Sequence, residues 1–454
     1  MTKLKKSKSK DSYIFGPSGL RGIVGKTLLP EEVLGFASAF GEFCKSGRII
    51  LGRDTRRSGG MLWHSVVCGL LSSGCEVIDI GICPTPTVGI AVKMRKASGG
   101  VVITSSHNPI QWNGLKFFSS DGSFLNDPQR KRFEKLLQKR RSHKRYNKLG
   151  KLYFEYGWAE RHIKKIIDLR YINKSKIKKK KLKVVIDCNN GTGSLFAPYL
   201  LESLGCKVVK LYCDLTKDFS HPPEPLAKNL KALQRMVKKN KADIGFATDP
   251  DADRLACVSE KGTPLGEEYT LALAVDFVLS KRRGKVVVNS STSRIIDDIA
   301  EKYNAFVYRT RVGEIYVANQ LKKIKGIVGG EGNGGVILPE YYKGRDALLG
   351  MALILQYLAE KDLPLSELVK EFPSYFMVKK AIKLGKNFEN RIEELKNRFK
   401  GMKISRIDGL KIENKDFWVQ IRKSNTEPLV RIFAEARSKR EAEGLVADVT
   451  KMLI

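Results

Sequence analysis

The stretch VVITSSHNPIQWNGLKFF, residues 101–118, decides the fold. Its first apolar residues predict a buried strand, which runs into the polar turn TSSHNP. A strand that delivers a serine and a histidine onto a turn is a common place for chemistry in α/β proteins. Ser106 is therefore a candidate nucleophile, with His107 beside it. A purely structural turn is the alternative, because Ser, Asn and Pro are ordinary turn formers.

Several other segments also run from an apolar strand into a polar loop rich in Gly, Ser or Asn. They are KVVIDCNNGTGS from Lys183, ADIGFATDPDAD from Ala242, GKVVVNSSTS from Gly284 and KGIVGGEGNGG from Lys325. Helical patterns follow several of them, which predicts parallel sheets covered by helices. In such sheets the loops at the carboxyl ends of the strands form the ligand site.

The alternation of segments predicts four domains in this chain of 454 residues. We place three α/β domains at residues 1–150, 151–259 and 260–372. The remaining segment, 373–454, is predicted to be a smaller α+β domain. It contains the strand-like runs WVQIRKSN and LVRIFAEA and ends in a helical pattern.

The charge of the chain is unusually positive. Lysine and arginine number 83 against 48 aspartates and glutamates, a formal net charge of +35. Two tracts, Lys3–Lys10 and Lys174–Lys183, concentrate this charge, and a nucleic-acid-associated basic protein is one interpretation. The tracts lack interleaved aromatic residues and any recognisable nucleic-acid module. Incidental surface charge with no specific nucleic-acid partner is therefore the favoured interpretation.

Composition also bears on location and redox state. No apolar run approaches the roughly 20 residues of a membrane helix. The basic N-terminus is not followed by the apolar segment of a secretory signal. Eight scattered cysteines without a CxxC pair argue against structural zinc and for free thiols. A cytoplasmic protein without a membrane partner is expected.

The loop ATDPDADR contains three alternating carboxylates, Asp249, Asp251 and Asp253. Carboxylates this close repel one another unless a cation compensates them, and oxygen ligands suit Mg²⁺. An EF-hand is disfavoured, because Arg254 stands at the sixth position, where that loop turns on glycine. A solvated acidic turn without metal is the remaining alternative.

A phosphate-binding loop is predicted at RKSNTEP, residues 422–428, between two strand-like runs. Arginine offers a planar fork of donors, and the Ser, Asn and Thr side chains add hydroxyl and amide donors. Arg431 lies three residues past the loop and is a further candidate. An ordinary hairpin connection is the alternative.

Two glycine-containing loops are further candidates. In GGEGNGG, residues 329–335, the glycines permit close approach of the backbone to a ligand. Glu331 and Asn333 are the side chains of that loop able to bind sugar hydroxyls, and a flexible linker is the alternative. In FGPSGLRG, residues 15–22, Arg21 is placed to reach a phosphate.

Taken together and in this order, the five loops resemble the α-D-phosphohexomutase superfamily of phosphoglucomutases, phosphomannomutases and phosphoglucosamine mutases. The resemblance spans nearly the whole chain, and the pairing of TSSHNP with DPDADR is its most specific part. It implies three related α/β domains with mixed, mostly parallel sheets and a smaller C-terminal α+β domain. These would form a heart-shaped molecule in which one loop of each domain meets in a central cleft.

The resemblance also implies roles for individual residues. Ser106 would be the serine that is phosphorylated in the active enzyme. Its phosphate would hold Mg²⁺ together with the three aspartates of the DPDADR loop. Lys116 and Arg21 would lie beside the transferring phosphoryl group, and Arg254 would complete the metal loop on the substrate side. The residues implied to anchor the other phosphate are Arg422, Ser424, Asn425 and Thr426.

These residues suit phosphoryl transfer, which needs charge neutralisation and positioning more than covalent assistance. By the resemblance, phospho-Ser106 donates to a hydroxyl of a hexose phosphate, giving a 1,6-bisphosphate that reorients and returns its original phosphate. A hexose 1,6-bisphosphate would also serve as activator. Lys116 is the first candidate for the acid/base role and His107 the second. A structural role for His107 is the alternative.

The chain departs from the superfamily in the loop GGEGNGG, residues 329–335, which we call the sugar loop. Many members have the motif GExSGH, whereas this chain has Asn333 in place of the serine and Gly335 in place of the histidine. This form, followed by GRDAL, looks like an archaeal-type phosphoglucosamine mutase branch and its bacterial relatives. It favours glucosamine 6-phosphate as substrate, with mannose and glucose phosphates as alternatives.

A phosphatase-like enzyme that loses the phosphate to water is a further alternative. A monomer or homodimer is expected.

Overall fold

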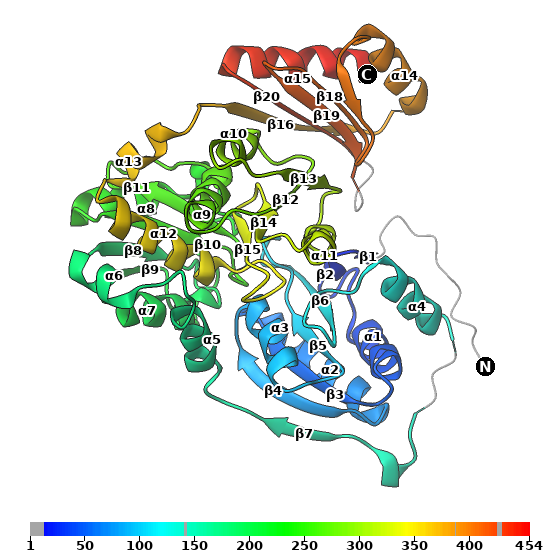
Figure 1. Ribbon diagram of the computed structural model, residues 1–454. Helices are drawn as coiled ribbons and strands as arrows, with labels where there is room; N and C mark the ends of the chain where they lie inside the picture. Colours follow the sequence, from blue (N-terminus) through cyan, green and yellow to red (C-terminus); the bar gives the residue numbers. More distant parts are fainter. Residues whose placement is uncertain (1–12, 140–142, 386, 425–428) are drawn as a thin grey trace.

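The computed structural model describes residues 13–139, 143–385, 387–424 and 429–454. The basic tract Lys3–Lys10 and two predicted site residues, Asn425 and Thr426, lie outside the described residues. The chain forms four domains, each built on one sheet. In Figure 1 the first domain is blue to cyan, the second green, the third yellow-green and the C-terminal domain orange to red.

The first domain contains a seven-stranded mixed sheet in the order β1-β2-β6-β5-β3-β4-β7. Its strands are β1 (Ile14–Gly16), β2 (Gly19–Ile23), β3 (Arg48–Arg53), β4 (Glu76–Ile82), β5 (Gly99–Ile103), β6 (Trp112–Ser119) and β7 (Lys151–Phe154). Its helices are α1 (Pro30–Phe43), α2 (Ser58–Ser72), α3 (Thr85–Met94) and α4 (Asp127–Leu137), followed by the 3₁₀ turn η1 (Tyr146–Lys148). The strand predicted from the opening stretch is confirmed as β5, which is buried along its whole length.

The second domain has a four-stranded sheet in the order β11-β10-β8-β9. The strands are β8 (Lys183–Asp187), β9 (Lys207–Leu211), β10 (Ile244–Thr248) and β11 (Leu255–Ser259). The helices are α5 (Trp158–Ile167), α6 (Lys174–Lys180), α7 (Gly193–Ser203) and α8 (Lys231–Asn240), with the 3₁₀ turn η2 (Ala227–Asn229). β7 pairs with β4, so the first sheet extends just past residue 150, where the sequence placed the domain boundary.

The third domain has a four-stranded sheet in the order β13-β12-β14-β15. The strands are β12 (Val286–Asn289), β13 (Val307–Thr310), β14 (Val328–Glu331) and β15 (Gly335–Ile337). The helices are α9 (Glu267–Lys281), α10 (Ile295–Lys302), α11 (Glu314–Ile324), α12 (Ala347–Lys361) and α13 (Leu365–Leu368), with the 3₁₀ turn η3 (Val369–Glu371).

One strand arrangement recurs in all three α/β domains. In each, three parallel strands are followed by a strand that turns back antiparallel to the third: β6 on β5, β11 on β10, and β15 on β14. The loop that joins this pair carries Ser106 in the first domain, the acidic DPDADR loop in the second and the GEGNG loop in the third. The expectation of three related α/β domains is confirmed, and three candidate loops occupy equivalent positions in them.

The C-terminal domain is an antiparallel five-stranded sheet with the order β16-β20-β19-β18-β17. Its strands are β16 (Phe376–Lys383), β17 (Lys403–Ser405), β18 (Leu410–Glu413), β19 (Trp418–Lys423) and β20 (Leu429–Ala436). Its helices are α14 (Phe388–Arg398) and α15 (Lys439–Leu453). The two predicted strands and the final helix are confirmed as β19, β20 and α15.

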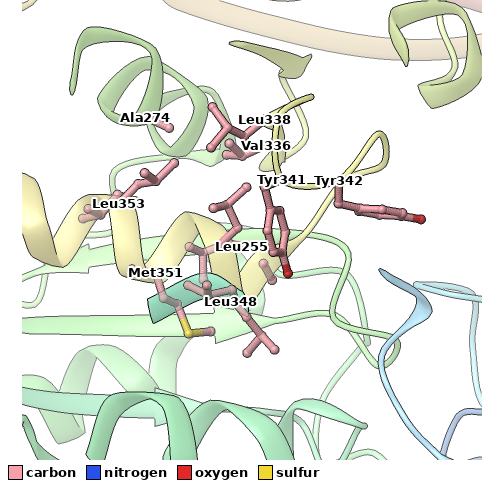
Figure 2. Packing of buried hydrophobic residues seen from close by; sticks show 14 of the residues in the cluster. Leu255, Ala274, Val336, Leu338, Tyr341, Tyr342, Leu348, Met351 and Leu353 are labelled. Carbon is pink, nitrogen blue, oxygen red and sulfur yellow. The ribbon is translucent and has the colours of Figure 1, made fainter. Parts of the chain in front are cut away.

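Helix α12 joins the second and third domains through one hydrophobic core. Nearly every residue of α12 is buried, because the helix lies between the two sheets rather than on a surface. Figure 2 shows Leu348 and Met351 of this helix beside Leu255 of β11. The backbone N–H of Leu255 also donates to Gly334 O at 3.1 Å. The loops of these two domains are thereby held at a fixed separation.

In the described parts of the chain, no helix combines the length and apolar character that crossing a bilayer requires.

A buried lysine lies at the contact between the third and fourth domains. Lys411 of β18 donates from Nζ to Ser290 O at 2.9 Å, and Nζ lies 4.2 Å from the centre of the Trp418 ring. Burial, assisted by the nearby Arg309, lowers the pKa of Lys411 to about 7. Glu413, Asp297 and Glu435 face it and act in the opposite direction.

Lys411 predicts a pH dependence of stability. Between pH 7 and the ordinary lysine pKa near 10.4, the unfolded state binds a proton that the folded state lacks, so stability rises with pH. The slope is at most about 1.4 kcal/mol per pH unit. Thermal denaturation from pH 7 to 9.5 should show this rise in the wild type and a smaller one in Lys411→Met. Identical slopes in the two proteins would contradict the assignment.

Candidate active site

Three buried carboxylates form an acidic cluster in the loop between β10 and β11. Asp249, Asp251 and Asp253 are fully buried, and one oxygen of each lies within 4.8 Å of the others. The turn is tight, because Ala252 adopts a left-handed φ of 49°. Asp249 Oδ1 accepts from the backbone N–H groups of Asp253 and Arg254, both at 3.1 Å. The loop therefore closes around its own first carboxylate.

Two cations from other domains compensate the acidic cluster. Lys116 of β6 donates from Nζ to Asp251 Oδ2 at 2.6 Å and to Asp253 Oδ2 at 3.0 Å. Arg345, from the segment before α12, donates from Nη2 to Asp253 Oδ2 at 2.9 Å. Burial alone would raise the pKa of Asp253, but these cations hold it below its usual value. For Asp249, burial and the two neighbouring carboxylates raise the pKa well above its usual value.

Two oxygens of the acidic cluster have no hydrogen-bond donor among the described residues. They are Asp251 Oδ1 and Asp253 Oδ1, and both are buried. Such oxygens are costly to bury unless they bind something. An all-oxygen donor set suits a hard divalent ion such as Mg²⁺. The three carboxylates could therefore hold a metal.

Ser106 lies directly against the acidic cluster. Its Oγ donates to Asp249 Oδ2 at 2.8 Å, across 143 residues of sequence. Its side chain is buried, and its φ of 49° is left-handed. The Ser106 N–H donates to Thr104 Oγ1 at 2.9 Å, which fixes the turn from the strand side. The structure thus brings together the predicted nucleophile and the predicted metal ligands.

A buried arginine that the sequence analysis did not select supports the serine loop. Arg56 donates to the carbonyl oxygens of Ser106, Asn108 and Pro109, each at 2.7 Å. Its Nε donates to Asp54 Oδ2 at 3.0 Å, so its charge is paired. A planar guanidinium can hold several acceptors in a fixed geometry. Arg56 therefore holds the backbone of the turn that carries Ser106.

His107 and Arg21 flank the serine. His107 Nδ1 lies 3.3 Å from Ser106 Oγ. Burial, together with the nearby Arg254 and Arg21, lowers the pKa of His107 well below its usual value. Arg21 donates from Nη1 to Asn108 Oδ1 at 2.9 Å, and burial and Arg254 lower its pKa to about 10. Both side chains are therefore buried close to Arg254.

A cavity of about 570 Å³ opens in front of Ser106 and is lined by all four domains. Ser106 and the aspartates lie behind its wall, which His107 and Lys116 form on that side. The other predicted site residues in the wall are Arg21, Arg254, Glu331, Asn333, Arg422, Ser424 and Arg431. Asn425 and Thr426 lie outside the described residues. The candidate loops thus converge on one cavity.

The sugar-loop carboxylate is held by the protein itself. Glu331 Oε1 accepts from Asn289 Nδ2 and from the Gly313 N–H, both at 2.9 Å. Glu331 Oε2 accepts from Arg345 Nη1 at 2.8 Å, and Asn333 Oδ1 lies 3.4 Å from the same nitrogen. These contacts fix the orientation of Glu331.

The C-terminal domain contributes positive charge to the cavity wall. Arg422 of β19 pairs in register with Arg431 of β20, so two guanidinium groups come from neighbouring strands. Burial lowers the pKa of Arg422 despite Asp408, whose Oδ2 lies 3.7 Å from its Nε. The Ser424 N–H donates to Leu429 O at 2.8 Å and closes the base of the loop. Arg254, also in the cavity wall, donates from Nη1 to Glu224 Oε1 at 3.1 Å.

Arg345 was missed by the sequence analysis, although a signal for it exists. Asp346 precedes an apolar run and caps α12, accepting from the N–H groups of Leu348 and Leu349. An arginine next to such a cap, after a candidate ligand loop, is placed to reach that loop. Sequence alone does not indicate which carboxylates it meets.

Comparison with known proteins identifies the family. The chain matches the phosphoglucomutase/phosphomannomutase family in its α/β/α domains I, II and III at residues 12–144, 160–262 and 266–376. The C-terminal domain of the family matches residues 369–452.

Individual relatives and a solved structure carry names of the same family. A Thermococcus kodakarensis phosphoglucomutase/phosphomannomutase is 40% identical over 442 residues, covering 94% of this chain and 96% of the relative. A probable phosphoglucosamine mutase of Thermococcus gammatolerans is 36% identical and covers 97% and 98%. The crystal structure of a phosphoglucomutase/phosphomannomutase family protein from Burkholderia thailandensis superposes with a TM-score of 0.83 at 26% identity, covering 97% and 96%.

The fold and the shared cavity define a four-domain phosphoryl-transfer enzyme of the isomerase class, a phosphohexomutase. The chain belongs to the phosphoglucomutase/phosphomannomutase family, within the α-D-phosphohexomutase superfamily.

The acidic cluster predicts a magnesium site that depends on each carboxylate. Replacing Asp251 by asparagine removes one anionic ligand and leaves the shape of the side chain nearly unchanged, so Mg²⁺ affinity should fall by about tenfold or more. Isothermal titration of the purified protein with MgCl₂ measures this. Asp448→Asn, on the exposed face of α15, is the matched control and should bind Mg²⁺ as the wild type does. Equal affinity in both variants would place the metal elsewhere.

Proposed function

We propose that this protein moves a phosphoryl group between the 6- and 1-positions of a hexose phosphate, through a phosphoserine enzyme and a hexose 1,6-bisphosphate. The observation that carries this proposal is the contact of Ser106 Oγ with Asp249 Oδ2 at 2.8 Å. This contact puts a hydroxyl beside carboxylates that could hold a metal. The cavity in front of them is also lined by Arg422 and Arg431, which could bind a second phosphate. A phosphate at each end of one sugar matches that arrangement.

In the proposed reaction Ser106 Oγ carries the phosphoryl group. A hydroxyl of the bound hexose phosphate attacks the phosphorus, the new O–P bond forms, and the bond from phosphorus to Ser106 Oγ breaks. Arg21 and Lys116 lie on the wall beside Ser106 and stabilise the charge of the transferring group. The sugar, now a bisphosphate, reorients and returns its other phosphate to Ser106. Mg²⁺, held by the three aspartates, would supply further charge neutralisation.

The attacking hydroxyl must lose a proton, and two side chains are within reach of this step. Lys116 is the first candidate for the acid/base role, but its contacts with Asp251 and Asp253 raise its pKa despite burial, so as an ammonium it serves as the acid that returns a proton. His107 is the second candidate, and because burial lowers its pKa, its neutral ring can accept the proton, with Nδ1 3.3 Å from Ser106 Oγ. Elsewhere in the cavity wall, Arg422 and Arg431 are proposed to hold the phosphate that is not being transferred.

Glucosamine 6-phosphate is the proposed substrate, converted to glucosamine 1-phosphate. The name of the Thermococcus gammatolerans relative supports it. Mannose and glucose phosphates are the second candidates, because the relative with 40% identity is named phosphoglucomutase/phosphomannomutase.

The substrate proposal predicts a ranking of rates. Coupled assays with Mg²⁺ and a hexose 1,6-bisphosphate activator should give a higher kcat/KM for glucosamine 6-phosphate than for the mannose or glucose compounds, by about tenfold or more. A preference for either neutral sugar would overturn the amino-sugar assignment while leaving the mutase mechanism in place. Release of inorganic phosphate without isomer would instead show a phosphatase.

The phosphoserine proposal predicts the effect of removing one hydroxyl. Ser106→Ala should lower mutase turnover by about a thousandfold or more, because the phosphoryl carrier is lost while the fold is unchanged. Ser105→Ala is the matched control next to it and should stay within about tenfold of the wild type, because its hydroxyl makes only a 3.3 Å contact with Asn108. Wild-type turnover in Ser106→Ala would exclude the proposed mechanism.

A further inference from the structure

A single guanidinium group links the sugar loop to the acidic cluster. Arg345 Nη2 donates to Asp253 Oδ2 at 2.9 Å, and Nη1 donates to Glu331 Oε2 at 2.8 Å. Its Nε donates to Glu314 Oε2 at 3.0 Å. Arg345 is also part of the cavity wall. Three carboxylates from three separate segments thus share one buried cation.

The backbone on both sides of this arginine is fixed. The Arg345 N–H donates to Glu314 Oε1 at 3.2 Å, and the Asp346 N–H donates to Val336 O at 3.0 Å. Asp346 also caps α12 and accepts at Oδ2 from Tyr341 OH and from His162 Nε2, both at 2.8 Å. The guanidinium therefore projects from a rigid point, and its three contacts set the spacing of the loops that it joins.

The stem of Arg345 explains why the sugar loop has a glycine at position 335. A Cβ at Gly335 would lie 2.1 Å from Arg345 Cδ and 2.8 Å from Cγ. The backbone of Gly335 does not itself call for glycine, because its φ is not in the left-handed region. Gly334 is different, since its φ is 86°. At position 335 the constraint is space, and Arg345 occupies that space.

We infer that Arg345 and Gly335 are a matched pair, in which Arg345 positions Glu331 for the sugar and couples the sugar loop to Asp253. The positioning of Glu331 for the sugar rests on the proposed function, whereas the packing of Arg345 against Gly335 does not. Arg345 acts through Glu331 and Asp253, so it is a positioning residue. A lysine at 345 would keep the stem and the charge but could not hold three carboxylates in a fixed geometry.

The first test is a double-mutant cycle on thermal unfolding, which needs no activity. Gly335→Ala should lower Tm in the wild-type background, because its methyl group meets the Arg345 stem. In the Arg345→Ala background the same change should cost little, because the stem is gone. Gly444→Ala, in α15 with nothing within 4 Å of the added methyl, is the control and should not lower Tm. Additive changes in Tm would overturn the pairing.

The second test separates positioning from stability, and it keeps the inference falsifiable if Arg345→Ala fails to fold. Arg345→Lys should raise KM for the hexose phosphate, or lower kcat/KM, by about tenfold or more while Tm changes by only a few degrees. Wild-type kinetics in Arg345→Lys would overturn the positioning role. If the wild type itself shows no mutase activity, the proposed function fails, whereas the unfolding cycle still decides whether the pair exists.

Discussion

The compensation of three buried carboxylates is the interaction on which the rest of this structure depends. Asp249, Asp251 and Asp253 are withdrawn from water, and unpaired charges in such a place are strongly destabilising. Their own domain does not supply the cations that contact them most closely. Lys116 comes from the first domain and Arg345 from the third. The acidic cluster is therefore compensated only when the three α/β domains are docked together.

Further contacts between the domains hold the site in a fixed geometry. α12 packs in the core between the second and third domains, and its capping residue Asp346 bonds to His162 of the second. His162 in turn contacts Thr87 of the first domain at 2.8 Å. The C-terminal domain contributes Arg422 and Arg431 to the cavity wall. Three domains thus hold the serine and the acidic cluster, while the fourth adds these two cations to the same cavity.

Much of the fold and of the site could be predicted from the sequence, because each site loop is a polar turn that directly follows an apolar, strand-like run. Ser106, the three aspartates and Glu331 all lie where a buried strand ends in a polar turn, and the repeated strand arrangement then brings those turns together. Residues whose contacts are made with segments far away in the sequence could not be found from local composition. Arg56 meets the serine loop across 50 residues, and Arg345 meets Asp253 across 92. β7, just past residue 150, joins the first sheet by pairing with β4, which local pattern cannot show.

The central claim is that Ser106, held against the acidic cluster, is the phosphoryl carrier. The most direct test is phosphopeptide mapping by mass spectrometry after incubation of the full chain with Mg²⁺ and glucose 1,6-bisphosphate. The account predicts one phosphate on the peptide that contains Ser106, lost again when excess hexose monophosphate is added. A phosphate on another residue, or a Ser106 peptide that stays unmodified while the enzyme turns over, would contradict it.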